Sequence, residues 1–162
     1  MKYTTLFLDR DGTLIQKPPE GDYIKSISEV HFLPGVLEAM PMLDQAFERI
    51  IVVTNQRGVA KGVLSIQTLT QIHNYIHSQV WGAIDRFYFC PHELDACNCR
   101  KPLPGLAFQA QLDFHAIYLS DSIVVGDSQT DMQFARNIGA LPIHISSRYN
   151  LLDFAKQIRT VS

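Results

Sequence analysis

Short apolar segments and longer amphipathic segments alternate along this chain. Strands are predicted where short, mostly apolar runs occur, at residues 3–8, 49–54, 86–89, 123–126 and 141–145. Helices are predicted where apolar residues recur at helical spacing, in segments that begin near residues 34, 65, 104, 128 and 151. This alternation is typical of a doubly wound parallel sheet, so the predicted fold class is α/β.

Capping and helix-breaking residues indicate where several helices begin and end. Ser65 is expected to cap a helix that runs to Val80, and Ser128 is expected to cap a helix that Gly139 ends. Pro41 interrupts the first helical segment. We expect it to kink that helix or to move its start further along the chain, because proline cannot donate a backbone hydrogen bond.

Other aromatic and histidine residues are interpreted as structural. Trp81 and the aromatic residues 87–89 are expected to lie in the core. His73 and His77 have the i, i+4 spacing of a metal-binding pair, but Asn74 stands where the H-E-x-x-H motif has glutamate. We therefore expect these two histidines to be surface or partly packed residues.

Polar side chains follow four of the predicted strands at their carboxyl ends. They are Asp9 and Asp11, Thr54 and Asn55, a cysteine cluster with Arg100 and Lys101, and Asp127. Residues i and i+2 of an extended chain project to the same side, so both acids of the first pair can face one small volume. Ligands of doubly wound sheets bind outside the carboxyl ends of the strands. We therefore expect an active site there, although Asp-Gly is also a common turn signal.

Composition limits the possible classes of protein. The 162 residues suit a single domain spanning 1–162, with 46% hydrophobic and 19% charged residues. The net charge of −2 gives no field that favours nucleic acid or an anionic membrane. No apolar stretch approaches the ~20 residues of a membrane span. We expect a monomer that acts on a small molecule, with neither nucleic acid nor membrane as a partner.

All three cysteines lie within one stretch of ten residues. A disulfide would leave one thiol unpaired, so an oxidising compartment is disfavoured and a cytoplasmic location is expected. Cys90, His92, Cys97 and Cys99 can instead fill the tetrahedral shell of a structural zinc ion. The alternative is a solvent-facing loop with reduced thiols.

The groups at the strand ends suit phosphoryl transfer. Asp9 and Asp127 offer carboxylate oxygens, which Mg²⁺ prefers as ligands. Thr54 offers a hydroxyl and Lys101 a positive charge to phosphoryl oxygens. Asp9 is then the expected nucleophile, which forms an aspartyl-phosphate, and Asp11 the expected acid and base.

Four segments resemble the four motifs of the haloacid dehalogenase superfamily. They are residues 9–13, 54–56, 100–102 and 126–131, and the spacing covers roughly residues 5–145. The resemblance implies a Rossmann-like fold. Residues 12–33 are expected to form a loop or small hairpin, and the interval between Ile15 and Phe32 leaves no room for a separate cap domain. The walls of the site are then expected from the loop of residues 15–30 and from the zinc-bound loop.

The resemblance also implies roles for individual residues. It implies Mg²⁺ at Asp9, Asp127 and the main-chain carbonyl of Asp11, phosphoryl stabilisation by Thr54 and Lys101, and substrate contact by Arg100. Asn55 and Arg57 are further candidates for substrate binding. Arg57 is placed to meet a second anionic group, and a solvated basic loop is the alternative.

The cysteine cluster followed by residues 100–102 is similar to the zinc-loop subfamily, which contains heptose bisphosphate phosphatases and histidinol-phosphate phosphatases. Residues 21–23 and 54–62 look more like the former, and residues 14–19 and the short zinc loop look more like the latter. The chain lacks the second catalytic domain that many histidinol phosphatases carry. The expected substrate is therefore D-glycero-D-manno-heptose 1,7-bisphosphate, cleaved at position 7, with histidinol phosphate as the alternative.

The sequence leaves two other functions as alternatives. One is a zinc-stabilised binding module without turnover, which the intact Asp9, Asp11, Lys101 and Asp127 disfavour. The other is a DNA 3′-phosphatase, which the acidic net charge and the lack of a basic, aromatic-studded groove disfavour.

Overall fold

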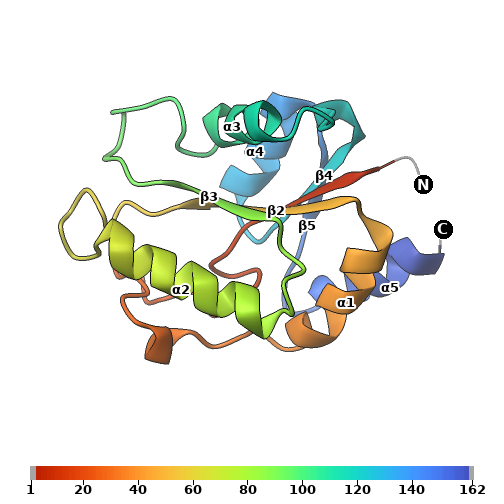
Figure 1. Ribbon diagram of the computed structural model, residues 1–162, viewed down its shortest axis with the longest axis horizontal. Helices are drawn as coiled ribbons and strands as arrows, with labels where there is room; N and C mark the ends of the chain where they lie inside the picture. Colours follow the sequence, from red (N-terminus) through yellow and green to blue (C-terminus); the bar gives the residue numbers. More distant parts are fainter. Residues whose placement is uncertain (1–2, 161–162) are drawn as a thin grey trace.

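A computed structural model describes residues 3–160 as a five-stranded parallel sheet with helices on both faces (Figure 1). The strands are β1 (Thr5–Leu8), β2 (Arg49–Asn55), β3 (Arg86–Cys90), β4 (Ser122–Gly126) and β5 (Leu141–His144), in the order β3-β2-β1-β4-β5. The helices are α1 (Val36–Ala46), α2 (Ile66–Gln79), α3 (Gly105–Asp113), α4 (Gln129–Ile138) and α5 (Leu151–Thr160), with 3-10 turns η1 (Ile27–Glu29) and η2 (Leu119–Asp121). The predicted doubly wound α/β fold is confirmed. Residues 1–2 and 161–162 of the expected domain lie outside the described residues.

The alternation of side chains along β1 divides the core into two layers. Leu6 and Leu8 belong to a cluster that includes buried residues of α1, α2 and α5. Phe7, between them, belongs to a second cluster with α3 and α4. Figure 1 shows these two groups of helices on opposite faces of the sheet. Strand order reverses beside β1, which pairs with β2 on one side and with β4 on the other, so the carboxyl ends of β1 and β4 flank the switch point.

The capping residues predicted from the sequence are confirmed. The Ser65 side chain accepts a hydrogen bond from the backbone N–H of Thr68 at the start of α2. At the start of α4, Ser128 and Asp131 form a reciprocal capping box. Gly139 ends α4 in the left-handed conformation with φ 74°.

Of the two effects expected of Pro41, a kink or a later start of the helix, the later start is wrong. α1 begins at Val36 and continues with Pro41 inside it. Val36, Ala39, Met40 and Leu43 of this helix are buried, and α1 packs against α5. Burial of this face holds the helix together across the hydrogen bond that proline cannot donate.

Two interpretations of single side chains are also wrong. Trp81 is 69% exposed rather than in the core, because it lies in the turn after α2 with a left-handed φ of 54°. His73 is buried rather than at the surface or partly packed, and its ring stacks on Phe87 of β3, whereas His77 is exposed as expected. Tyr88 is buried as predicted, whereas Phe87 and Phe89 are partly buried.

The chain between β1 and α1 is a loop. Among the described residues it contains only η1 and isolated bridges, so the predicted absence of a large cap domain is confirmed. Within residues 3–160, no helix is long and apolar enough to cross a membrane.

Candidate active site

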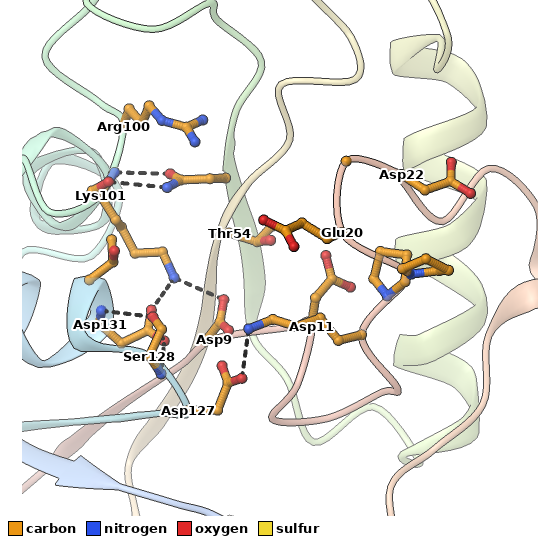
Figure 2. Close-up of a pocket in the computed structure, with 16 residues that line it drawn as sticks. Asp9, Asp11, Glu20, Asp22, Thr54, Arg100, Lys101, Asp127, Ser128 and Asp131 are labelled. Carbon is orange, nitrogen blue, oxygen red and sulfur yellow. Dashed lines mark hydrogen bonds and ion pairs between the residues drawn. The ribbon is translucent and has the colours of Figure 1, made fainter.

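A pocket of about 470 Å³ opens at the carboxyl ends of the strands (Figure 2). Its lining includes seven of the residues predicted from the sequence: Asp9, Asp11, Thr54, Asn55, Arg100, Lys101 and Asp127. Residues 17–22 of the loop after β1 form another part of the wall. The predicted convergence of the strand-end residues is therefore observed.

Arg57 is not brought into this pocket. Its guanidinium contacts the carboxylate of Glu93, in the loop that carries the cysteines. This contact neutralises the charge that was expected to meet a second anionic group. Direct substrate binding by Arg57 is therefore not supported by its position.

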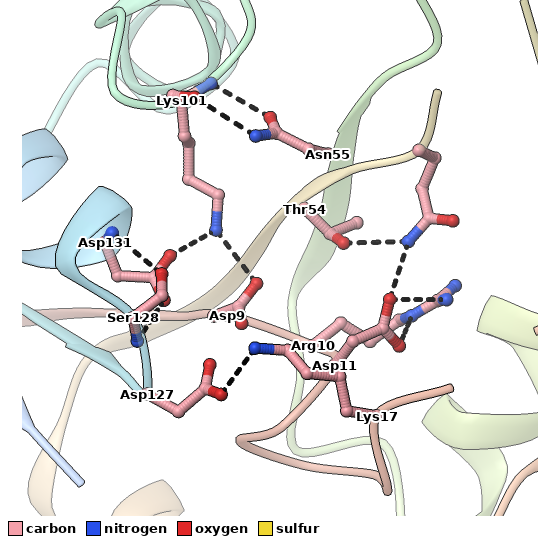
Figure 3. A network of polar contacts seen from close by, with 11 residues as sticks. Asp9, Arg10, Asp11, Lys17, Thr54, Asn55, Lys101, Asp127, Ser128 and Asp131 are labelled. Carbon is pink, nitrogen blue, oxygen red and sulfur yellow. Dashed lines mark hydrogen bonds and ion pairs between the residues drawn. The ribbon is translucent and has the colours of Figure 1, made fainter. Parts of the chain in front are cut away.

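Lys101 occupies the centre of the site. Its ammonium donates to Asp9 Oδ1 at 2.9 Å and to Asp131 Oδ1 at 2.7 Å, and its side chain is 3% exposed (Figure 3). Burial acts to lower the pKa of Lys101, but the two carboxylates outweigh it and raise that pKa. The ammonium is therefore charged and shared between two acids.

Asn55 holds the backbone of Lys101 rather than projecting freely into the pocket. Its Oδ1 accepts from the Lys101 backbone N–H at 2.9 Å, and its Nδ2 donates to the Lys101 carbonyl at 3.1 Å. The amide that was expected to bind substrate is therefore used to position the lysine.

Three carboxylates form a group that can hold a cation. Ligand oxygens of Asp9, Asp127 and Asp131 lie within 4.8 Å of one another. Burial raises the pKa of the Asp9 carboxyl to about 7, although the Lys101 ammonium acts in the opposite direction. Asp127 Oδ1 is buried and has no hydrogen-bond partner among the described residues. An unpaired buried oxygen within an all-oxygen donor set fits Mg²⁺.

Gly12 allows Asp127 to enter this group. Its φ of 86° lies in the left-handed region, and an added Cβ would lie 2.3 Å from Asp127 Oδ2. That oxygen accepts from the Lys17 ammonium at 2.8 Å, a contact that the sequence did not indicate. Glycine after Asp11 is thus required for the approach of the β4 carboxylate as well as for the turn after β1.

Asp11 is turned toward two residues to which the sequence analysis gave no role. Its carboxylate accepts from Arg10 Nε at 2.9 Å and Nη2 at 3.1 Å, and from Gln56 Nε2 at 3.2 Å. Gln56 Nε2 also donates to Thr54 Oγ1 at 2.9 Å, so one amide joins the acid to the predicted phosphate-binding hydroxyl. The sequence feature that could have indicated these contacts is an arginine placed directly between two acids at the end of a buried strand.

Arg100 provides a free donor on the pocket wall. Its Nη1 is buried without a hydrogen-bond partner among the described residues. A buried guanidinium nitrogen without a partner carries a free-energy cost that an anionic ligand removes. The pocket can therefore hold an anion between Arg100 and Lys101.

The four predicted zinc ligands lie together beside the pocket. Ligand atoms of Cys90, His92, Cys97 and Cys99 are all within 4.8 Å of one another, and the three cysteines are free thiols. His92 Nδ1 lies 3.1 Å from Cys99 Sγ. Three sulfurs and one imidazole nitrogen converging on one point fit a structural zinc ion with no open position. Cys99 directly precedes Arg100 and Lys101 in the chain. The cluster therefore fixes the backbone that carries the two basic side chains of the pocket.

Replacing Cys97 with serine is expected to release zinc and to raise KM about tenfold or more, because a loosened loop no longer holds Arg100 in place. Elemental analysis and steady-state kinetics measure both effects. Leu94→Ala is the matched control, since Leu94 is an exposed residue of the same loop. Full zinc content in the serine variant would contradict the assignment of this ligand.

Residues 5–141 match the sequence profile of the family described as polynucleotide kinase 3 phosphatase. The chain belongs to this family. It is 37% identical over 141 residues to D-glycero-beta-D-manno-heptose-1,7-bisphosphate 7-phosphatase of Neisseria meningitidis, covering 85% of this chain and 74% of that protein. It is 39% identical over 143 residues to the D-glycero-alpha-D-manno-heptose-1,7-bisphosphate 7-phosphatase of Mycobacterium tuberculosis, covering 83% of this chain and 73% of that protein.

Solved structures share the fold. The crystal structure of D,D-heptose 1,7-bisphosphate phosphatase from B. bronchiseptica, complexed with magnesium and phosphate, matches with a TM-score of 0.87 and 30% identity, covering 98% of this chain and 99% of that one. A HAD-superfamily hydrolase from Ehrlichia chaffeensis is only 17% identical but matches with a TM-score of 0.72. The resemblance to haloacid dehalogenase phosphatases, inferred from four motifs, is confirmed by the family match and by the heptose bisphosphate phosphatase relatives.

Proposed function

We propose that this protein is a Mg²⁺-dependent phosphomonoesterase that removes the 7-phosphate of D-glycero-D-manno-heptose 1,7-bisphosphate. The observation that carries the proposal is the group of Asp9, Lys101, Asp127 and Arg100 in one pocket of a chain related to enzymes of that name. The pocket supplies a nucleophile, an oxygen donor set for a divalent cation, and two cations for a phosphoryl group.

Asp9 acts as the nucleophile in this proposal. A bond forms between an Asp9 carboxylate oxygen and phosphorus while the bond between phosphorus and the ester oxygen breaks. Asp11, in its carboxylic acid form, donates a proton to the departing alkoxide and becomes a carboxylate. It then takes a proton from water, whose oxygen attacks the phosphorus and releases phosphate and free Asp9.

The other residues bind and orient the phosphoryl group. Lys101 and Arg100 offset its charge, Thr54 donates its hydroxyl, and Asn55 holds the backbone of Lys101. Asp9, Asp127 and the main-chain carbonyl of Asp11 would hold Mg²⁺, which neutralises charge on the phosphoryl oxygens when bound. The zinc-bound loop keeps the two cations in place over the pocket.

Steady-state kinetics on three esters tests the substrate. We expect kcat/KM for the heptose bisphosphate to exceed that for histidinol phosphate and for a DNA 3′-phosphate. The last alternative comes from the family description, and the net charge of −2 gives no field that favours a nucleic acid end. A hundredfold preference for histidinol phosphate or for the nucleic acid end would overturn the heptose assignment.

A non-catalytic, zinc-stabilised binding module is disfavoured by the buried contact between Lys101 and Asp9. Desolvating an ammonium and two carboxylates has a large free-energy cost, and a module that only binds has no need of such buried charges.

We further propose that residues 1–162 act as one monomeric, cytoplasmic unit. Free thiols gathered in a zinc-binding arrangement support a reducing location, and size-exclusion chromatography with light scattering tests the monomer.

A further inference from the structure

Arg10 is completely buried beneath the candidate active site. Its side chain is 0% exposed, although it stands directly between the two acids that line the pocket. It continues the alternation of Leu6 and Leu8, and therefore lies on the face of the sheet that α2 covers. A guanidinium in such a place is costly unless every contact compensates for the lost water.

Arg10 binds the Asp11 carboxylate through two parallel hydrogen bonds. Nε donates to Oδ1 at 2.9 Å and Nη2 donates to Oδ2 at 3.1 Å, as Figure 3 shows. Gln56 donates to the same Oδ2 at 3.2 Å. A two-point contact of this kind fixes the plane of a carboxylate as well as its position. The orientation of Asp11 is thus determined by a residue that does not line the pocket.

His73 holds the opposite side of the guanidinium. Its Nε2 lies 3.1 Å from Arg10 Nη1, and its ring stacks on Phe87 at a centroid distance of 4.5 Å. Burial, together with the nearby Arg10 charge, lowers the pKa of His73 to about 3. The ring is therefore neutral, and Nε2 accepts the hydrogen bond from the arginine.

We propose that Arg10 and His73 are positioning residues, which aim the Asp11 carboxylate so that it can transfer a proton to the departing alcohol. The inference rests on the acid and base role of Asp11 in the proposed function. The contacts run from His73, which stacks on Phe87, through Arg10 to Asp11. Neither positioning residue touches the substrate.

The dependence on the leaving group distinguishes positioning of an acid from general support of the fold. An alkoxide such as the 7-oxygen of the heptose needs a proton as it departs, whereas 4-nitrophenolate leaves as a stable anion. We therefore compare release of the alcohol from the heptose bisphosphate and from 4-nitrophenyl phosphate, in single-turnover experiments with Mg²⁺ and excess enzyme. This readout isolates the first chemical step from hydrolysis of the aspartyl-phosphate.

Arg10→Lys keeps the positive charge but removes the pair of parallel hydrogen bonds to the Asp11 carboxylate. We expect it to slow release from the alkyl ester about 100-fold and from the aryl ester less than about fivefold, because general acid catalysis contributes only where the leaving group needs a proton. Equal losses on both esters, or no loss on either, would overturn the inference.

His73 provides a second test, which decides alone if Arg10→Lys does not fold. His73→Leu removes the acceptor and is expected to slow the alkyl ester selectively, by about tenfold. His73→Gln places an amide oxygen near the lost Nε2 and is expected to restore the rate to within about twofold. His77→Gln is the matched control, since His77 lies one turn later on α2 and contacts the Ile84 carbonyl instead.

Failure of the rescue, with His73→Gln as slow as His73→Leu and both folded by circular dichroism, would overturn the role of the histidine. A wild-type protein that cleaves neither ester contradicts the proposed function itself. Cleavage of both by the wild type, with unchanged selectivity in the variants, contradicts only the positioning role.

Discussion

Asp9→Asn is expected to lower kcat at least about 10⁴-fold, because a neutral amide cannot attack phosphorus as a carboxylate does. Asp9 is the buried acid that Lys101 contacts, and it belongs to the group of oxygens that can hold Mg²⁺. Release of phosphate from 4-nitrophenyl phosphate measures the effect, since this ester does not depend on the identity of the natural substrate. Acid quenching should detect a phosphorylated protein for the wild type and none for the variant.

Asp44→Asn serves as the control for this variant. It removes the same charge from an exposed position near the end of α1, which leads into the amino end of β2 rather than its carboxyl end. The control should retain wild-type turnover. Activity of Asp9→Asn within tenfold of the wild type, with the amide shown intact by mass spectrometry, would exclude Asp9 as the nucleophile.

Lys101→Met is expected to lower the free energy of unfolding by about 3–5 kcal/mol in the absence of Mg²⁺. The substitution leaves the buried carboxylates of Asp9 and Asp131 without the ammonium that they share. A divalent cation can replace part of that charge, so Mg²⁺ should stabilise the variant more than the wild type. Urea denaturation with and without Mg²⁺ measures both effects.

Lys17→Met is the matched control, because Lys17 also pairs with a carboxylate of the same group but its side chain is 57% exposed. Surface ion pairs contribute about 1 kcal/mol or less, so this variant should unfold close to the wild type. Equal losses in the two variants would show that burial does not decide the strength of these pairs. No loss in either would show that Lys101 does not neutralise the carboxylates.

The local signals predicted the elements that local forces control. Ser65, Ser128 and Gly139 determine helix ends through contacts within a few residues, and all three were assigned correctly from their neighbours in sequence. Pro41 and Trp81 were misjudged because packing decides their environment. The buried face of α1 outweighs the missing hydrogen bond, and the turn after α2 directs Trp81 into solvent.

The same division holds for the site. The acidic, basic and thiol residues directly follow predicted strands in the sequence. Because the carboxyl ends of parallel strands share one edge of the sheet, the sequence alone indicated that these side chains gather there. Only the tertiary structure decided which charge pairs with which. Lys17 and Asp127 are 110 positions apart, and Arg10 and His73 are 63 apart, so their contacts depend on how the loop after β1 and helix α2 fold over the sheet. Strand alternation predicts which face of the sheet a side chain takes, but not the partner that it meets there, and only the folded chain brings Arg57 to Glu93 and Arg10 to His73.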